Sequence, residues 1–255
     1  MNKVFKYVFA DILQNRIILI YTSVLLIATY SIFNLEDTSS KGLLSMLNVT
    51  LMMVPLVSIV FSTIYIYNSS EFIELLLSQP VQRKNIWLGL YTGLSTAFGL
   101  SYLLGAGIIT LIFEPSITGC ILVISGILLS YIFTALAFLA AVYTRDKARG
   151  IGVAIMLWIY FSVLFDGLVL FALFQFADYP IEKPMIAVSL LNPIDLTRIF
   201  MLMQLDVAAM MGYTGAIFKD FFSTNIGWIV SFTTLLLWIL LPLFFSLNKF
   251  KRKDI

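Results

Sequence analysis

The sequence predicts an all-α, polytopic membrane protein with six transmembrane helices. Apolar residues make up 60% of the chain and charged residues only 12%, whereas a soluble domain has about 45–50% and about 25%. The apolar residues gather in runs long enough to cross about 30 Å of hydrocarbon as helices. Because these runs lack the alternation of a barrel strand, helices are the expected element. With short connections they use nearly the whole chain, which predicts one membrane domain over residues 1–255.

The first element expected is an interfacial helix at residues 1–16. From Lys3 to Asn15, apolar side chains recur at helical spacing with polar ones between them: Val4, Phe5, Val8, Phe9, Ile12 and Leu13. Such a helix lies in the plane of the membrane surface; the alternative is a solvated start to the first span. The apolar run from Ile17 is expected to be an uncleaved span, because no small-residue cleavage site follows it.

By length and hydropathy, the six spans are expected near residues 17–33, 43–67, 86–113, 119–143, 151–176 and 226–247. The second contains Pro55, and the third is rich in glycine. In the third span, Gly89 and Gly93 form a small-x-x-x-small pair that permits close helix approach, within the chain or between two copies.

The lysines and arginines predict the orientation. One side of the predicted membrane holds Lys3, Lys6, Arg16, Arg83, Lys84, Arg145, Lys147, Arg149, Lys249, Lys251, Arg252 and Lys253. The other side holds only Lys41, Lys183, Arg198 and Lys219. Because cytoplasmic connections carry the excess of positive residues, both termini are predicted to be cytoplasmic. An even number of spans agrees with this orientation.

The cytoplasmic connection at residues 68–85 is expected to contain a short transverse helix. Ser69 or Ser70 can cap it, Glu71 lies in its first turn, and Pro80 stops it after about two turns. This helix would present Glu71 and Glu74 to a partner in the cytoplasm. The alternative is a turn at the membrane surface that has no partner.

The connection at residues 177–225 is expected to be extracytoplasmic and partly helical. Asn192 and Pro193 have the pattern of a helix start, since Asn caps well and Pro fits the first turn. The stretch from Ile194 to Met211 mixes apolar residues with Asp195 and Arg198. We expect one or two re-entrant or interfacial helices here, ended by residues 212–215, and not a seventh span.

The chain lacks the residues of several kinds of active site. It has no histidine and one cysteine, Cys120, which excludes an internal disulfide and the usual Ser–His–Asp triad. It also lacks the P-loop pattern by which many proteins bind ATP. The sequence therefore predicts no enzyme activity of its own.

Asp166 is the one carboxylate within the predicted span cores. A charge at the bilayer centre costs at least about 2.5–3.5 kcal/mol, so this side chain should face protein or water, or be protonated. It either contacts a substrate, proton or partner in a cavity, or forms a buried hydrogen bond to a neighbouring helix. Met203 and Met210 share a helix face and are speculative copper ligands, because thioethers bind Cu(I); apolar packing is the alternative.

The order of these elements resembles the ABC-2 type transporter permeases over nearly the whole chain. The most specific similarity is residues 71–90, EFIELLLSQPVQRKNIWLGL. Residues that fit the family pattern are Glu71, Phe72, Glu74, Leu75, Leu76, Ser78, Pro80 and Arg83. The resemblance implies that they form a coupling helix, which docks on an ATPase subunit. Leu90 departs from the family pattern, which usually has a basic residue there.

Residues 148–170 and 191–203 are similar to the branch of this family that matures nitrous-oxide reductase. That resemblance implies a homodimer in the bacterial cytoplasmic (inner) membrane, two cytoplasmic ATPase subunits that use ATP, and a periplasmic accessory protein. Asn192, Asp195 and Arg198 are candidates to contact that accessory protein. Copper would be a cargo and not a bound cofactor, by weak passage past Met and Asp166 or with no passage at all.

Two other functions fit the same sequence. One is an ABC-2 exporter of a lipid, drug or polysaccharide, and the other is a membrane scaffold that transports nothing. Neighbouring genes would separate the first from the maturation permease. The scaffold predicts that Glu71→Ala and Glu74→Ala leave the ATPase rate of every partner unchanged.

Overall fold

The computed structural model describes residues 2–176, 182–205 and 224–252, and these residues contain helices and no strands. Six of the helices are long and apolar enough to cross a membrane: Arg16–Leu35, Ser39–Asn68, Arg83–Phe113, Ile117–Tyr143, Lys147–Ala172 and Ile226–Lys251. This confirms the all-α, six-span fold class. We number these spans one to six in chain order.

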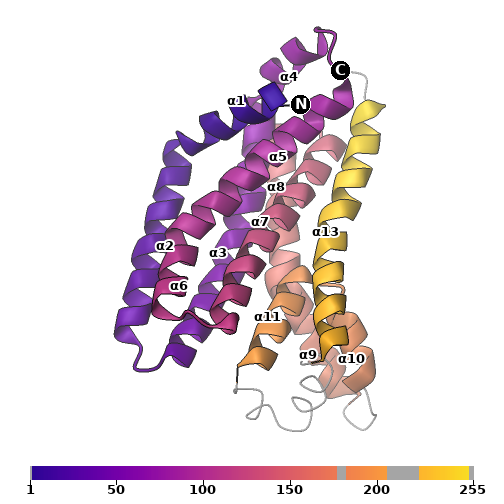
Figure 1. The fold of residues 1–255 in the computed structure, drawn as a ribbon. Coiled ribbons are helices and arrows are strands. Elements are labelled where there is room, and N and C mark those ends of the chain that lie inside the picture. The colour runs from indigo at the N-terminus through magenta and orange to yellow at the C-terminus, as the bar shows by residue number, and fades with distance from the viewer. Residues whose placement is uncertain (1, 177–181, 206–223, 253–255) are drawn as a thin grey trace.

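The helices stand side by side in a bundle, with α1 and α4 across one end of it (Figure 1). Their bounds are α1 Asn2–Leu13, α2 Arg16–Leu35, α3 Ser39–Asn68, α4 Ser70–Leu77, α5 Arg83–Tyr102, α6 Ile108–Phe113, α7 Ile117–Tyr143, α8 Lys147–Ile159, α9 Phe165–Gln175, α10 Glu182–Ser189, α11 Pro193–Gln204 and α13 Asn225–Lys251. Two π-helical segments, η1 Leu103–Gly107 and η2 Tyr160–Leu164, join α5 to α6 and α8 to α9. We call the end that carries α1, α4 and the last turn of α13 the α4 end.

Three spans begin three or four residues earlier than their hydropathy predicts. Span two begins at Ser39, span three at Arg83 and span five at Lys147. In span five the Asp146 side chain caps the helix by accepting from the Ala148 N–H. The basic residues of that first turn therefore belong to the helix, although a search for apolar runs leaves them out.

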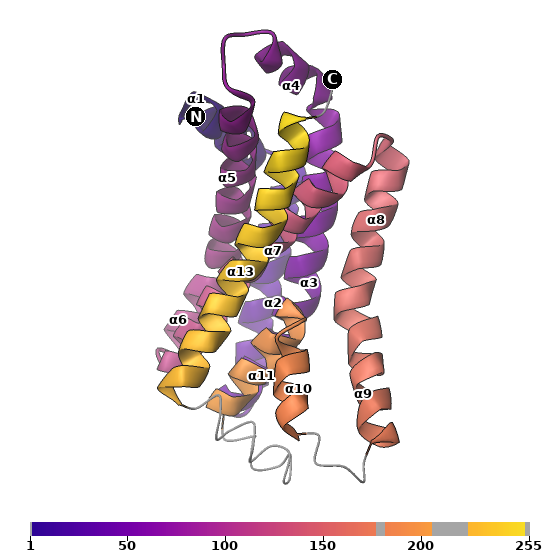
Figure 2. The ribbon, with the colours of Figure 1, turned by 90° about the vertical axis from the view of Figure 1, so that its right-hand side faces the viewer.

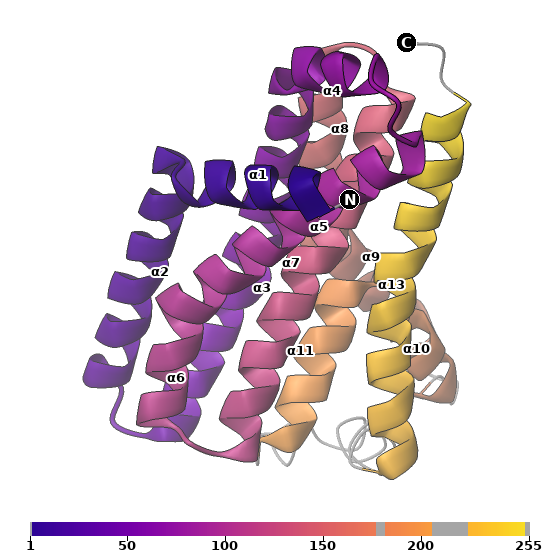
Figure 3. The same cartoon turned by 45° about the horizontal axis from the view of Figure 1, so that its top comes forward.

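Helix α1 lies across the bundle, at a steep angle to the spans (Figure 3). Its buried side chains, Val4, Val8 and Ile12, follow the predicted helical spacing. It packs on α5, where a Cβ on Gly93 would lie 2.8 Å from Val8 Cγ1. The small residue at position 93 thus serves a close approach within the chain. Packing on span three holds this helix in place.

Helix α7 forms the centre of the bundle and packs against α3, α5 and α13. Tyr102 of α5 is fully buried beside it, and its hydroxyl lies 3.1 Å from Thr50 Oγ1 of α3. The Tyr102 ring fills the space over Gly126, so any Cβ at that position would overlap the ring. Spans two, three and four are therefore fastened at one buried point.

Span five, made of α8, η2 and α9, stands at the side of the bundle (Figure 2). Only 17% of its most apolar window is buried, against 78% for span four. Large side chains of span five are exposed along its length, including Met156, Leu168 and Phe171. In a membrane this surface faces lipid or another protein chain.

Helices α10 and α11 form a hairpin at the end opposite α4, and α11 packs against α3, α7 and α13 (Figure 2). The connection between them enters the bundle, where Trp238 Nε1 donates to the Leu190 carbonyl at 3.1 Å. The pair is therefore re-entrant and not a seventh span. The predicted stop at residues 212–215 lies outside the described residues.

Candidate functional site

Helix α4 lies across the α4 end and is the element predicted to meet a partner (Figure 2). It has Glu71 in its first turn and ends at Leu77, three residues before Pro80. Its N-cap residue is Ser69, but the Ser69 side chain forms no capping hydrogen bond. A single buried side chain, Ile73, fastens this helix to the bundle.

The structure divides the predicted coupling residues into two groups. Glu71, Glu74, Leu75, Pro80 and Arg83 are exposed. Phe72 and Leu76 are half-buried and pack inside the protein: the Phe72 ring stacks on Tyr7 of α1 at 5.0 Å, and Leu76 packs on the core. The exposed group, and not Phe72, is the surface that a partner can reach.

Ile73 is a residue that the sequence analysis missed. With Leu76 and Leu77 it forms an i, i+3, i+4 apolar face, so the signal for its burial was present in the sequence. Its role is to fix which face of α4 points outward. As a result, Leu75, 66% exposed, lies on the outer side.

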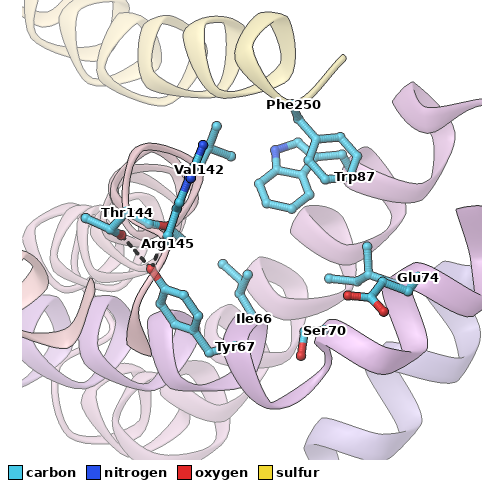
Figure 4. Close-up of a pocket in the computed structure, with 11 residues that line it drawn as sticks. Ile66, Tyr67, Ser70, Glu74, Trp87, Val142, Thr144, Arg145 and Phe250 are labelled. Atoms are coloured by element: carbon cyan, nitrogen blue, oxygen red, sulfur yellow. Dashed lines mark hydrogen bonds between the residues drawn. The ribbon is translucent and has the colours of Figure 1, made fainter. Parts of the chain in front are cut away.

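A groove of about 320 Å³ lies beneath α4. It is lined by Ile66, Tyr67, Ser70, Ile73, Glu74, Trp87, Ala141, Val142, Thr144, Arg145 and Phe250, which come from α3, α4, α5, α13 and the end of α7 (Figure 4). Glu74 from α4 and Arg145 after α7 both line it. A movement of α4 would therefore change the walls of a space shared by four of the six spans.

One wall of the groove is an aromatic joint around Trp87. The Trp87 ring stacks on Phe250 with centroids 4.1 Å apart (Figure 4). It also meets the Phe138 ring edge-on at 4.8 Å. Its Nε1 donates to Ser246 Oγ at 2.9 Å, and Ser246 donates to the Phe138 carbonyl at 3.0 Å. The N-terminal part of α5, close after α4 in the chain, is thus tied to both α13 and α7.

The opposite wall joins spans two and five. The Tyr67 hydroxyl hydrogen-bonds Thr144, and Lys147 Nζ donates to Asn68 Oδ1 at 2.7 Å. The Tyr67 ring also occupies the space over Gly150, so a Cβ there would overlap it. Because α4 begins directly after these residues of α3, its N-terminal end is connected to the start of span five.

A second polar site lies between span five and α11. Asp166 forms an ion pair with Arg198, and Arg198 Nη1 lies 3.8 Å from Asp195 Oδ1. Of the two possibilities for Asp166, the structure shows the bond to a neighbouring helix. Its second oxygen, Oδ1, is buried without a hydrogen-bond partner.

Asn192 holds the start of α11 in the bundle. Its side-chain oxygen accepts from the Ile194 N–H at 2.9 Å, and its amide donates to the Phe161 carbonyl of η2 at 2.7 Å. Asn192 and Asp195 are buried and Arg198 is part-buried. Asn192 and Arg198 thus bond to span five, and Asp195 lies beside Arg198. That these three residues contact a periplasmic partner stays a prediction.

The pairing of Met203 and Met210 as copper ligands stays a prediction. Met203 is 4% exposed and packs in the apolar core of α11, and Met210 lies outside the described residues. Within the residues that the structure describes, no three His, Cys, Asp or Glu side chains lie close enough to hold a metal ion.

Comparison with known proteins gives two kinds of match. The family model described as ABC-2 family transporter protein matches residues 9–255. Two similar relatives carry the name "Probable ABC transporter permease protein NosY". The one from Pseudomonas aeruginosa is 29% identical over 181 residues, which is 66% of each chain. The one from Stutzerimonas stutzeri is 27% identical over 168 residues, 61% of this chain and 60% of the relative. The match thus spans just under two thirds of these relatives.

Proposed function

The chain belongs to the ABC-2 family as a membrane permease subunit of a bacterial ABC transporter, and from this premise we propose that α4 is its coupling helix. Permeases of this family work with cytoplasmic ABC ATPase subunits and are not catalytic themselves. The observation that carries the proposal is the two-sided character of α4. Ile73 fastens one face to the bundle, while Glu71, Glu74 and Leu75 stand exposed on the other.

The contacts beneath α4 supply a route for mechanical work. Closure of the ATPase would displace α4 and the N-terminal part of α5, which holds Trp87. Because Trp87 is bonded to α13 and packed on α7, the displacement would reach spans four and six as a rigid shift. Tyr67 and Lys147 would carry the same displacement to span five.

This assignment requires the α4 end to face the cytoplasm, with both chain termini on that side. The distribution of Lys and Arg supports it, because the connections at the α4 end hold most of the 16 basic residues. A reporter that works only in the cytoplasm should therefore be active when it is fused after Arg252.

A narrower proposal concerns what the permease drives. The two relatives named NosY, together with the similarity of residues 148–170 and 191–203, support a role in copper delivery to, or maturation of, periplasmic nitrous-oxide reductase. The chain would act as a homodimer with ATPase subunits and a periplasmic accessory protein. Asp166 is paired with Arg198 and Met203 is packed in the core, so we favour relay of conformational work over passage of copper.

In the relay, the α10–α11 hairpin is the output element. It is fixed to span five by Asn192 and Arg198 and to span six through the Trp238–Leu190 bond. Relative movement of those two spans would therefore tilt the hairpin. The hairpin lies at the end opposite α4, where a periplasmic protein would bind.

The test of the coupling helix is copurification from detergent with the candidate ATPase, followed by its ATPase rate. Glu71→Lys/Glu74→Lys should lose the ATPase, because it reverses two exposed charges without touching the Ile73 anchor. Asp37→Lys, a charge reversal at the opposite end, is the control and should retain it. If the double variant still retains the ATPase, the exposed face of α4 is not the docking surface. If even the wild type binds no ATPase, the scaffold function would stand in its place.

A further inference from the structure

A second groove at the α4 end lies on the outside of the bundle, between the end of α7 and the last two turns of α13. Its volume is about 270 Å³, and its lining residues are Tyr143, Phe245, Asn248, Lys249 and Arg252. The lining contains two cations, an amide and a phenol, and no acidic side chain. Such a set of donors around one concave space suits an anion.

Neither cation pairs with a carboxylate of the described residues. Lys249 and Arg252 are exposed, and within the described residues neither forms an ion pair. Lys249 Nζ lies 5.6 Å from the centre of the Tyr143 ring, which places its charge over the groove. Basic residues also suit the C-terminal turn of any helix, but that role requires neither a groove nor a tyrosine from a different helix.

The surface below the groove is apolar and open. Phe245 is 54% exposed, and Leu241, one turn earlier on the same face of α13, is 52% exposed. Since both residues belong to a membrane span, these side chains face hydrocarbon. A molecule in the groove would have its polar part among the cations and an apolar part along α13.

We propose that this groove binds the phosphate of an anionic phospholipid, with an acyl chain lying along Leu241 and Phe245. Basic pockets between spans at the membrane edge bind anionic headgroups in this way. A free phosphate would match the cations but would leave Leu241 and Phe245 without a partner. These two apolar side chains therefore favour a lipid as the molecule bound. The site does not depend on what the transporter carries.

The position of the groove gives the lipid a structural effect. Lys249 is adjacent to Phe250, which stacks on Trp87, and Tyr143 ends α7. A phosphate held by Lys249, Arg252 and Asn248 next to Tyr143 would fasten the end of α13 to α7. Occupancy should therefore raise the thermal stability of the protein.

The test titrates the full chain in a neutral detergent with phosphatidylglycerol and follows the unfolding temperature. Phosphatidylcholine with the same acyl chains tests the need for net negative charge, and glycerol 3-phosphate tests the need for the acyl chain. Phosphatidylglycerol alone should raise the unfolding temperature in a saturable manner. If glycerol 3-phosphate alone also raises the unfolding temperature in a saturable manner, the groove binds a free phosphate and the lipid proposal is wrong.

Lys249→Ala/Arg252→Ala should raise the half-saturating concentration of phosphatidylglycerol by about 25-fold, at about fivefold for each cation. The control, Lys6→Ala/Lys84→Ala, removes two exposed charges from the same end but outside the groove. It should change the half-saturating concentration of phosphatidylglycerol by no more than about twofold. Lys249→Arg should retain binding. If both double variants lose the same affinity, the attraction is diffuse and the groove is not a site. Unfolding temperatures measured without lipid identify any variant that fails to fold.

Discussion

Spans four and five are almost equally apolar, yet they are packed in opposite ways. Their most apolar windows have mean hydropathies of 2.4 and 2.2, but 78% of the first window is buried and only 17% of the second. In lipid an apolar side chain is equally well solvated against hydrocarbon or against another helix. Hydropathy therefore shows that both segments span a membrane and gives no information about which one lies at the centre.

The difference lies in the size of the side chains and in where polar groups are used. Span four has small residues at its contacts, such as Gly126, Ser130 and Ala137, which let neighbouring helices approach closely. Span five has large exposed residues and is tied to α11 by single polar bonds, through Asp166 and the Phe161 carbonyl. Packing on several sides fixes span four, whereas span five packs on the bundle along one side and is joined to α11 by these directed bonds.

The largest effect should come from adding one carbon atom to span four. Gly126→Ala places a Cβ inside the Tyr102 ring and displaces the Thr50 bond, which should cost about 2–3 kcal/mol of unfolding free energy. Gly152→Ala in span five is the matched control, because nothing lies within 4 Å of its Cβ position. Reversible unfolding in mixed micelles measures both. Equal losses would remove the contrast between the two spans.

Loss of the Asp166–Arg198 ion pair should lower the unfolding free energy by less than Gly126→Ala does. Arg198→Ala should lower the unfolding free energy by about 2 kcal/mol, below the roughly 3–5 kcal/mol of a fully buried pair, since the two side chains are 31% and 28% exposed. Asp166→Asn combined with Arg198→Ala should recover part of this loss. A double-mutant cycle measures the coupling, expected at about 1 kcal/mol. If the effects of the two substitutions simply add, the ion pair does not hold span five.

The hydrogen bonds of Asn192 should contribute slightly less to the unfolding free energy than the Asp166–Arg198 ion pair. Asn192→Ala removes a helix cap, at about 1 kcal/mol, and an interhelical bond, at about 0.6 kcal/mol. Asn192→Ser keeps a capping oxygen but is too short to reach Phe161, so it should recover only the first part. Hydrogen exchange of α11 should increase more than that of α7. An unchanged α11 would mean that packing alone holds the hairpin.

The smallest effect on stability, below about 0.5 kcal/mol, is expected at the exposed face of span five. Met156 is 73% exposed there. If this face meets a second copy in the proposed homodimer, Met156→Cys in a Cys120→Ser background should form a disulfide-linked dimer in membranes. Leu26→Cys, on an exposed face of span one, tests whether cross-linking is confined to span five. A chain that remains monomeric would assign the face to lipid.

Much of the α4 end was predictable from local sequence. The transverse helix, its acidic first turn and its end before Pro80 all follow from residues close together in the chain. Phe72 was included because it fits the family pattern, and its stacking on Tyr7 could not be predicted because Tyr7 lies far away in the sequence. The outward group of Glu71, Glu74 and Leu75 became distinct only once Ile73 was placed in the bundle.

The sequence by itself determined that the chain lies in a membrane, how many times it crosses, and the amphipathic character of α1. These properties depend on composition and on periodicities of a few residues. Only the tertiary structure decided that α7 is the centre, that Arg198 pairs with Asp166, and that Trp87 links three spans. The physical reason is that hydrocarbon and protein interior solvate apolar side chains alike, so the neighbours of a span are selected by shape and by a few polar bonds between distant residues.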